Sequence, residues 1–560
     1  MNKIIWIVFA LLLGQVSTVA QDISQIRKQK PFSWTGNIQS GMDWYEAKGI
    51  PPRGSNFAWG IRGNANASVY GINLPFSFAI GRQRPEYFAP TFARIGVSPT
   101  YKWLKLHAGH RNLNFSDYTL AGHTFLGGGI ELTPRKFRFA AMYGRFQKPV
   151  VEDTSITAFN LPAYRRMGYG LKIGIGSDRT YFDLIAFHAA DDTTTSVPKI
   201  AQFNPPKRNT VFGLQSQIQL GRFISWRGNA GLSILTRNLL SNAIILPIDT
   251  LPEWAESLVE RSKFSTTTRV NIAAKTGITV QLKTMQLRAE YERIDPEYES
   301  LGAYFFQNDM ENYTLGMSGT FAKGKVAING NGGIQRNNLL GNRSETTRRW
   351  VGNGTIAVNP SPKWGCMLNY NNFAVNQSAG RIALSDTVRL RQINQTFVLV
   401  PRFTIIKDTT SVQNLTLTAN YQNLNDLNPL TRQYANMDVY VAQFNYAYNY
   451  MPKQWTLNAG LNINRVKTAL VDNRQSGFTL GCNKAFQAGK LSTGISGTHN
   501  FSRLADKRDG SITSAQFNLA WSPHSKHTLS TYASLLRTRS IAYDDYTEWR
   551  MGVQWAIRLR

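Results

Sequence analysis

The sequence lacks long apolar runs. After residue 20, no stretch of about 18 consecutive apolar residues occurs, and the mean hydropathy is −0.29. A chain that crosses a bilayer repeatedly with apolar helices is therefore excluded. Helical periodicity is also scarce, because only Pro252–Lys263 has the pattern of an amphipathic helix, with Thr250 placed to cap it. A soluble chain of 560 residues would show many helices or several domains, so one all-β domain is predicted.

Cysteine and charge are scarce as well. The chain has 2 cysteines and 17% charged residues, so no disulfide framework is expected. Cys366 and Cys482 fall on the apolar parity of two well-separated strands. Since a disulfide needs Cα atoms within about 7 Å, we expect both thiols to be free. The net charge of +29 is dispersed over turns and strands without a recognised nucleic-acid-binding domain, so no nucleic-acid partner is predicted.

The first 20 residues have the organisation of a secretory signal peptide. Lys3 is followed by the apolar run Ile4–Leu13 and then by small residues that end at Ala20. The other interpretation, a single membrane anchor, is disfavoured because the run is too short to span a bilayer. Cleavage is predicted near Ala20. Residues 21–31 are expected to form a short periplasmic segment, and no Cys follows the cleavage site as in a lipoprotein.

Residues 32–560 alternate between apolar and polar positions. The last segment shows the pattern best, with polar Arg550, Gln554 and Arg558 on the face opposite to the apolar residues. The apolar face consists of Trp549, Met551, Val553, Trp555 and Ile557. Side chains of a strand point alternately to its two faces, so this segment predicts a strand with one apolar and one water-facing side. Similar segments recur along the chain.

The connections between these segments alternate in length. About 26 strands (range about 22–28) are predicted, with very short turns after even-numbered strands and connections of about six to 28 residues after odd-numbered ones. Most of the 34 acidic residues fall in the longer connections, whereas nearly all of the short turns carry Lys or Arg. An even number of strands places both ends of the barrel on the same side of a membrane.

With these features, residues 32–560 resemble bacterial outer-membrane β-barrel proteins. Gln21 after the signal, the Tyr- and Asn-rich strands and the length are similar to those of large porin-like barrels of the Bacteroidota type. The resemblance implies one transmembrane, antiparallel, up-and-down barrel in the outer membrane of a Gram-negative cell, in contact with lipid and lipopolysaccharide. The end at Arg560 departs from the aromatic last residue of typical barrels, so Trp555 is the nearest candidate for that signal.

A barrel of about 26 strands encloses a wide space. Only Gln21–Pro31 precedes the first predicted strand, so no plug domain is expected. The first functional interpretation is a porin-like channel for solutes. The alternative is a barrel that anchors, assembles or translocates a surface or periplasmic partner protein, which would also close the lumen. An outer-membrane hydrolase is the third.

The residues predicted to line the lumen are Arg288, Glu290, Glu292, Arg389, Arg391, Arg550, Gln554 and Arg558. Unpaired arginines would favour anionic solutes, whereas pairing of Arg288 with glutamates on neighbouring strands would cancel this effect. The longest connection carries Trp254, Leu258 and Val259 within Pro252–Lys263. Folded inward, this segment would constrict the pore; the other interpretation is a solvated surface helix. Trp549, Met551, Val553, Trp555 and Ile557 are predicted to face lipid.

Catalytic patterns are weak. No residue pair has the spacing expected of a lipase or protease at a barrel rim, and Asp191-Asp192 near His188 is the nearest match. His524-x-x-His527 in a short turn has the spacing of a metal pair, but a solvated turn is the simpler interpretation. We therefore expect no enzyme activity, no cofactor and no resident metal.

Overall fold

The computed structural model describes residues 31–559 except 71, 83–91, 151–162, 195–204, 243–263, 304–307, 343–344, 380–390, 429–430 and 542–543. The predicted signal peptide, the segment 21–30 and the candidate helix 252–263 lie outside the described residues. Among the described residues, the helices are α3 (Arg432–Ala435) and the 3-10 turn η3 (Gln487–Gly489). None of the described helices has the length and hydropathy needed to cross a bilayer.

The first half of the wall contains β1 (Phe32–Lys48), β2 (Phe57–Val69), β3 (Ile72–Arg82), β4 (Phe92–Val97), β5 (Thr100–Tyr101), β6 (Leu104–Asn112), β8 (Thr124–Leu132), β9 (Phe137–Gln147), β10 (Arg166–Gly176), β11 (Tyr181–Asp191), β12 (Arg208–Leu220), β13 (Ile224–Thr236), β14 (Thr268–Gln281) and β15 (Met285–Ile294). The short strands β7 (Leu120–Ala121) and β16 (Gly302–Ala303) form a separate pair.

The second half contains β17 (Met310–Phe321), β18 (Val326–Asn337), β19 (Glu345–Ser361), β20 (Trp364–Ala379), β21 (Arg391–Lys407), β22 (Ser411–Asp426), β23 (Met437–Tyr450), β24 (Trp455–Thr468), β25 (Asp472–Phe486), β26 (Leu491–Leu504), β27 (Lys507–His524), β28 (His527–Ser540) and β29 (Tyr546–Leu559).

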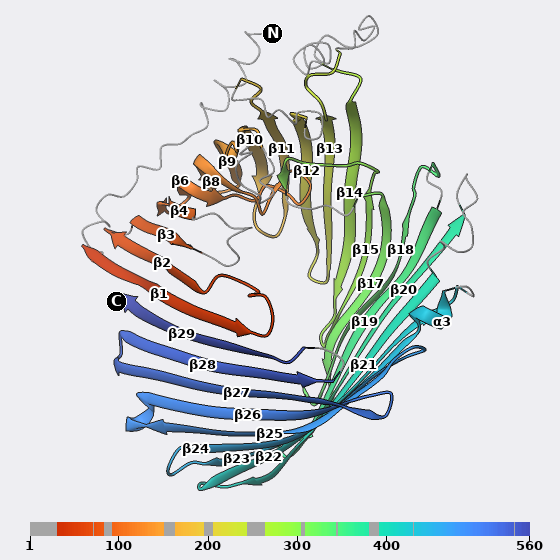
Figure 1. The fold of residues 1–560 in the computed structure, drawn as a ribbon. Helices are drawn as coiled ribbons and strands as arrows, with labels where there is room; N and C mark the ends of the chain where they lie inside the picture. Colours follow the sequence, from red (N-terminus) through yellow and green to blue (C-terminus); the bar gives the residue numbers. More distant parts are fainter. Residues whose placement is uncertain are drawn as a thin grey trace, which may run out of the picture.

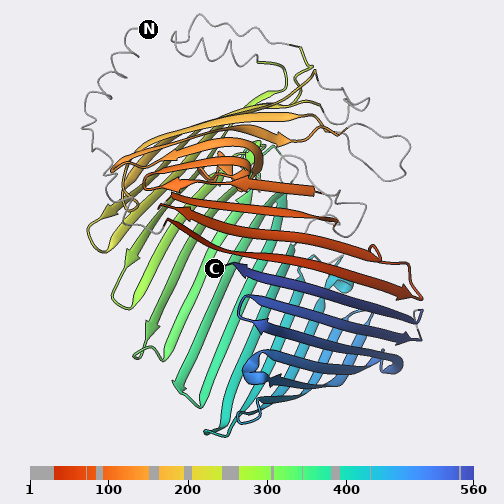
Figure 2. The same ribbon diagram turned by 90° about the vertical axis from the view of Figure 1, so that its left-hand side faces the viewer.

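These strands form one closed antiparallel barrel. The sheet has 27 strand segments, and β4 and β5 both pair with β3 and β6, so the wall has 26 strands, as predicted. The first and last strands close the ring, with Gly36 opposite Leu559 and Lys48 opposite Thr547. Figures 1 and 2 show β1 in red beside β29 in dark blue. Closure satisfies the backbone groups that an open sheet would leave unpaired at its edges.

The connection lengths confirm the alternation for most of the chain. Turns such as 221–223, 362–363 and 525–526 join strands at one end, which we call the short-turn end. The other end, the long-loop end, carries the connection 237–267 among others. The prediction was wrong for 469–471, 505–506 and 541–545, which are shorter than the six residues expected. There the strands of β24–β29 continue beyond the predicted boundaries, because their polar ends still pair with the neighbouring strand.

The two faces of the wall differ in what covers them. On β10, the alternate residues Tyr169, Leu171, Ile173 and Ile175 are exposed. The opposite face of the same wall carries the buried apolar residues of the molecule, against which segments from two loops pack. These loops leave β6 and β15 and meet over the strands between them. They therefore lie inside the curve of the wall, and we call this side the inner face.

Candidate functional site

Two loops from the long-loop end meet on the inner face. Residues 113–123 follow β6, and residues 295–303 follow β15. Leu120 pairs with Gly302 and Ala121 with Ala303 in the short parallel pair β7–β16. We call these two segments the shelf. Because strands far apart in the sequence supply them, the shelf depends on the curvature of the barrel.

Apolar packing attaches the shelf to the wall. Phe115, Leu120 and Leu301 belong to a buried cluster whose partners on the wall include Phe187 and Val211. Phe187 is 1% exposed and Val211 is 0% exposed. Burial of one such side chain stabilises by about 1.5–3 kcal/mol, so this cluster is the main attachment of the shelf.

Glycines on the inner face make room for the shelf. A Cβ atom at Gly170 would lie 2.8 Å from Cε2 of Phe115, and one at Gly231 would lie 2.5 Å from Oη of Tyr298. Real Cβ atoms essentially never approach heavy atoms this closely, so any side chain at either position would displace the shelf.

Two tyrosines bind the two segments to each other and to the wall. Tyr298 Oη donates a hydrogen bond to the carbonyl oxygen of Tyr118 at 2.7 Å, and Tyr118 Oη donates to Glu292 Oε1 at 2.6 Å. Burial raises the pKa of both hydroxyls, and for Tyr118 the neighbouring Glu292 raises it further. Both side chains therefore remain protonated donors at neutral pH.

The opposite wall differs in chemistry. The inner rows of β22–β28 consist mainly of amides and hydroxyls, and we call the following set the amide wall: Asn414, Thr416, Thr418, Asn420, Gln422, Gln443, Asn445, Asn449, Thr456, Asn458, Asn462, Asn464, Asn473, Gln475, Thr479, Asn483, Ser492, Ser496, Thr498, Asn500, Ser514, Gln516, Asn518, Thr528, Ser530, Tyr532 and Ser534. Between the first and last of these residues on each strand, the inner rows are fully described and carry no charged side chain. Asp426 shares the inner parity but lies beyond them, at the end of β22. None of the set is buried, so no described segment covers this wall.

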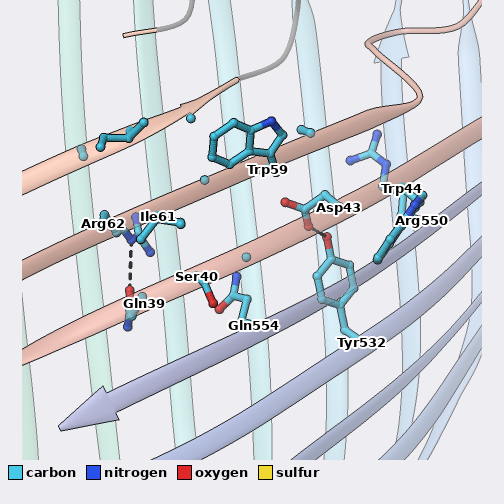
Figure 3. A pocket seen from close by; sticks show the side chains of 16 residues that line it. Gln39, Ser40, Asp43, Trp44, Trp59, Ile61, Arg62, Tyr532, Arg550 and Gln554 are labelled. Carbon is cyan, nitrogen blue, oxygen red and sulfur yellow. Dashed lines mark hydrogen bonds between the residues drawn. The ribbon is translucent and has the colours of Figure 1, made fainter. Parts of the chain in front are cut away.

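Charged groups gather instead where the barrel closes. Tyr45 Oη donates to Glu548 Oε1 at 2.5 Å, and the Arg550 guanidinium lies 5.1 Å from the centre of the Tyr45 ring. Tyr532 Oη donates to Asp43 Oδ1 at 2.7 Å. Figure 3 shows Asp43, Tyr532 and Arg550, from β1, β28 and β29, at a recess of about 490 Å³. We call this region the seam.

The predicted lumen-lining residues fall into two groups on the inner face. Arg288 and Glu290 line a recess of about 230 Å³. Arg550 and Gln554 line the recess at the seam, and Arg558 follows on the same parity of β29. Arg389 lies outside the described residues, and Arg391 is the first residue of β21, without a described side chain. That these groups line a water-filled pore stays a prediction.

The ionic partners differ from those considered from the sequence. Glu290 lies 3.9 Å from Lys275, not beside Arg288, and Glu292 accepts the Tyr118 hydroxyl. Antiparallel register places Glu292 opposite Lys275 and Arg288 opposite Thr279, which sequence spacing does not reveal.

The apolar set of β29 shares one face of its strand. Trp549, Met551 and Trp555 are exposed on the side opposite to Arg550 and Gln554. Val553 and Ile557 have the same parity and are half-buried. Contact of this set with lipid stays a prediction. The predicted constriction residues Trp254, Leu258 and Val259 lie outside the described residues.

The sequence reasoning missed the shelf. It predicted no packed loop after β6, which ends at Asn112. A signal was present, because Leu113, Phe115, Tyr118 and Leu120 make this outer connection unusually apolar. Such a loop is more stable when its apolar side chains pack against the wall than when they remain in water.

One group of side chains resembles a hydrolase triad in composition. Ser98 Oγ lies 2.9 Å from His107 Nδ1, and His107 Nε2 lies 2.7 Å from Glu131 Oε1. Lys105 Nζ contacts the same Glu131 oxygen at 3.0 Å. A nucleophile must reach its substrate, but Ser98 and His107 are both 6% exposed. We interpret this group as a buried polar network of the wall.

Both cysteines are free, as predicted. Cys366 lies on β20 and Cys482 on β25, five strands apart in the ring. The rings of His524 and His527 are 6.5 Å apart. Among the residues that the structure describes, no group of three or more His, Cys, Asp or Glu side chains is placed to hold a metal ion.

Comparison with known proteins finds structures that are similar at low sequence identity. No family model matches the chain, and no curated protein matches it either. Among solved structures, the P pilus usher (PapC) translocation pore is 10% identical, with a TM-score of 0.33 over 94% of this chain and 99% of that one. Acinetobacter baumannii OccAB4 is 10% identical, with a TM-score of 0.32 over 71% of this chain and 100% of that one.

A third structure, the ferric citrate transporter FecA, is 8% identical, with a TM-score of 0.35 over 93% of this chain and 78% of that one. Identities and TM-scores this low carry no argument about function. The assignment of the fold rests on the closed ring of strand pairs in this chain.

Proposed function

We propose that this chain is an outer-membrane channel of the porin type that conducts polar solutes. The observation that carries the proposal is the contrast between the two faces of a closed wall. Apolar residues such as Leu171 and Ile173 are exposed on the outer face, while amides such as Gln516 and Asn518 are exposed on the inner face. A barrel in lipid requires the first property and a water-filled lumen requires the second.

The same proposal predicts what the outer face and the two ends of the barrel contact. The exposed outer face would contact lipid and lipopolysaccharide, with Trp549 and Trp555 of β29 among the lipid-facing residues. The short-turn end would face the periplasm of a Gram-negative cell, as in other bacterial barrels. Export would follow from the predicted signal peptide ending near Ala20. An origin in the Bacteroidota is part of this proposal and is supported by the Tyr- and Asn-rich strands.

Planar-bilayer recordings test the proposal. The purified full chain should insert and produce defined conductance steps in KCl, because water and ions can pass in front of the uncovered amide wall. Heat-denatured protein is the control for detergent artefacts. If folded protein inserts, as shown by protease protection in vesicles, and yet carries no current, the channel proposal is rejected.

A second function is favoured by the width of the barrel. Eight strands leave an interior that side chains fill, whereas 16–18 strands leave an aqueous channel, and this wall has 26. The shelf packs on β9–β12 and leaves β22–β28 uncovered among the described residues. A partner protein that is anchored, assembled or translocated would fill that space. Silent bilayers together with a protein that co-purifies in a fixed ratio would favour this second function over the first.

A further inference from the structure

A recess lies on the amide wall next to the seam. It has a volume of about 420 Å³, and its lining includes Thr456, Asn483, Ser492, Asn518, Ser530 and Tyr532. Tyr532 and Gln554 also line the recess at the seam, so the two recesses adjoin. Together they run from β24 to β2 across the closure of the barrel. The amides and hydroxyls of β24–β28 lie in the first recess, whereas Asp43, Arg62 and Arg550 lie in the second.

We propose that the recess on the amide wall binds uncharged, hydroxyl-rich solutes, the chemical class of neutral oligosaccharides. The inference rests on the proposed function, since the solute must enter the barrel from one of its ends. It adds to the channel proposal a class of solute and the part of the lumen that binds this solute.

The hydrogen-bonding capacity of the wall matches that class. An Asn or Gln amide offers both donors and an acceptor, and a Ser or Thr hydroxyl offers both roles. A sugar hydroxyl also donates and accepts, so each can pair with either group. Asn483, Ser492 and Asn518, which line this recess, are exposed. Their donors and acceptors can therefore be reached by a hydroxyl-bearing ligand.

Tyr532 supplies the aromatic surface that sugar binding also uses. Its hydroxyl is held by Asp43 Oδ1 at 2.7 Å, which links β28 to β1 across the seam. Figure 3 shows the Tyr532 hydroxyl pointing to Asp43, with Gln554 to one side of the ring. A ring held in this way can pack its face against the C–H groups of a sugar, while the neighbouring amides bind the hydroxyls.

Charge argues against ionic solutes on this wall. The amide wall carries no charged side chain on its inner rows, so an anion or a cation would find no counter-charge on those rows. Lys484 borders the recess but has the outer parity of β25, with its Nζ 4.4 Å from the centre of the Trp455 ring. The charged groups lie at the seam and on the strands around β15, where Glu548 is partnered by Tyr45 and Glu290 by Lys275. A neutral solute needs no counter-charge from the wall, so it can bind along the amides.

Single-channel recordings with maltoheptaose as the probe test the inference. Maltoheptaose should interrupt the ion current for longer than a polyethylene glycol of matched hydrodynamic radius, because the polymer ethers accept hydrogen bonds but do not donate them. Sialyllactose, an acidic sugar, should interrupt the current more briefly than maltoheptaose.

The variants locate the effect. Asn483→Ala and Asn518→Ala should each weaken the block by maltoheptaose roughly two- to tenfold, the range for one lost hydrogen bond. Tyr532→Ala should weaken it, and Tyr532→Phe should retain most of the block because the ring remains. Asn331→Ala is the matched control, since Asn331 lies on the inner face in a different recess. Protease protection in vesicles equal to that of the unsubstituted chain shows that each variant has folded and inserted.

The outcomes separate the two proposals. Longer block by maltoheptaose that is lost in Asn518→Ala and kept in Asn331→Ala supports the inference. Normal conductance with equal block by the sugar and the polymer overturns the inference and leaves the channel proposal intact. Inserted protein without conductance overturns the channel proposal and this inference with it.

Discussion

Single residues decide how the shelf is held. The apolar side chain of Phe187 is 1% exposed beneath it, and loss of such a ring costs about 3–5 kcal/mol. The ion pair between Lys207 Nζ and Glu299 Oε1, which are 3.1 Å apart, is roughly one-third exposed. Ion pairs with that exposure contribute about 0.2–1 kcal/mol to the free energy of unfolding. Packing therefore dominates, and the ion pair mainly selects the position of the loop end.

A substitution at Gly231 tests how a single residue controls the packing of the shelf. Gly231→Ala should lower the free energy of unfolding in urea by about 1–3 kcal/mol, because the new Cβ would lie 2.5 Å from Tyr298 Oη. Gly316→Ala is the control, because its Cβ would find its nearest neighbour at 3.7 Å. Equal behaviour of both variants would contradict the packing of Tyr298 on Gly231.

At the scale of elements, the local sequence pattern determines the two faces of a strand, whereas contacts with residues distant in the sequence determine how the loops pack. Alternation along β29 places Trp549 and Arg550 on opposite faces whatever the neighbouring strands are. The pair β7–β16, in contrast, joins residues near 120 to residues near 302. The sequence predicted the first kind of feature and missed the second, because nothing local in either loop specifies the other.

A designed cross-link tests whether the two loops meet. In a background with Cys366→Ser and Cys482→Ser, the double variant Ala121→Cys and Ala303→Cys should form a disulfide on oxidation, since these residues are direct strand partners. The cross-link should raise the free energy of unfolding by about 2–4 kcal/mol. Intact-mass spectrometry measures the loss of the two thiol hydrogens. Ala121→Cys with Ala303 unchanged is the control, and persistence of both thiols under oxidation would show that the loops do not pair.

On the scale of the whole molecule, the interior has two chemically different sides. The shelf side is packed with apolar groups and carries paired charges such as Arg138 with Asp183 at 2.8 Å. The amide wall on β22–β28 is uncovered and neutral. Ion selectivity should therefore depend on the exposed charges near the seam, where Arg550 and Arg558 lie.

Charge reversal at the seam should change the ion selectivity. The double variant Arg550→Glu and Arg558→Glu should shift the reversal potential in a KCl gradient toward cation preference, because two positive charges at the lumen become negative. Arg348→Glu should leave it nearly unchanged, since Arg348 shares its parity with the exposed Trp350 on the outer face. A reversal potential that moves equally in both variants would place the conduction path elsewhere.

The number of strands, the alternation of faces and the short turns follow from the sequence alone, because each is encoded within a few neighbouring residues. The period of two in Trp549–Arg558 is enough to predict a strand with two unlike faces. The shelf, the seam and the recess around Tyr532 exist only in the folded barrel. Their members come from strands that curvature and closure bring together, so the register between β28, β29 and β1 places Tyr532 beside Asp43.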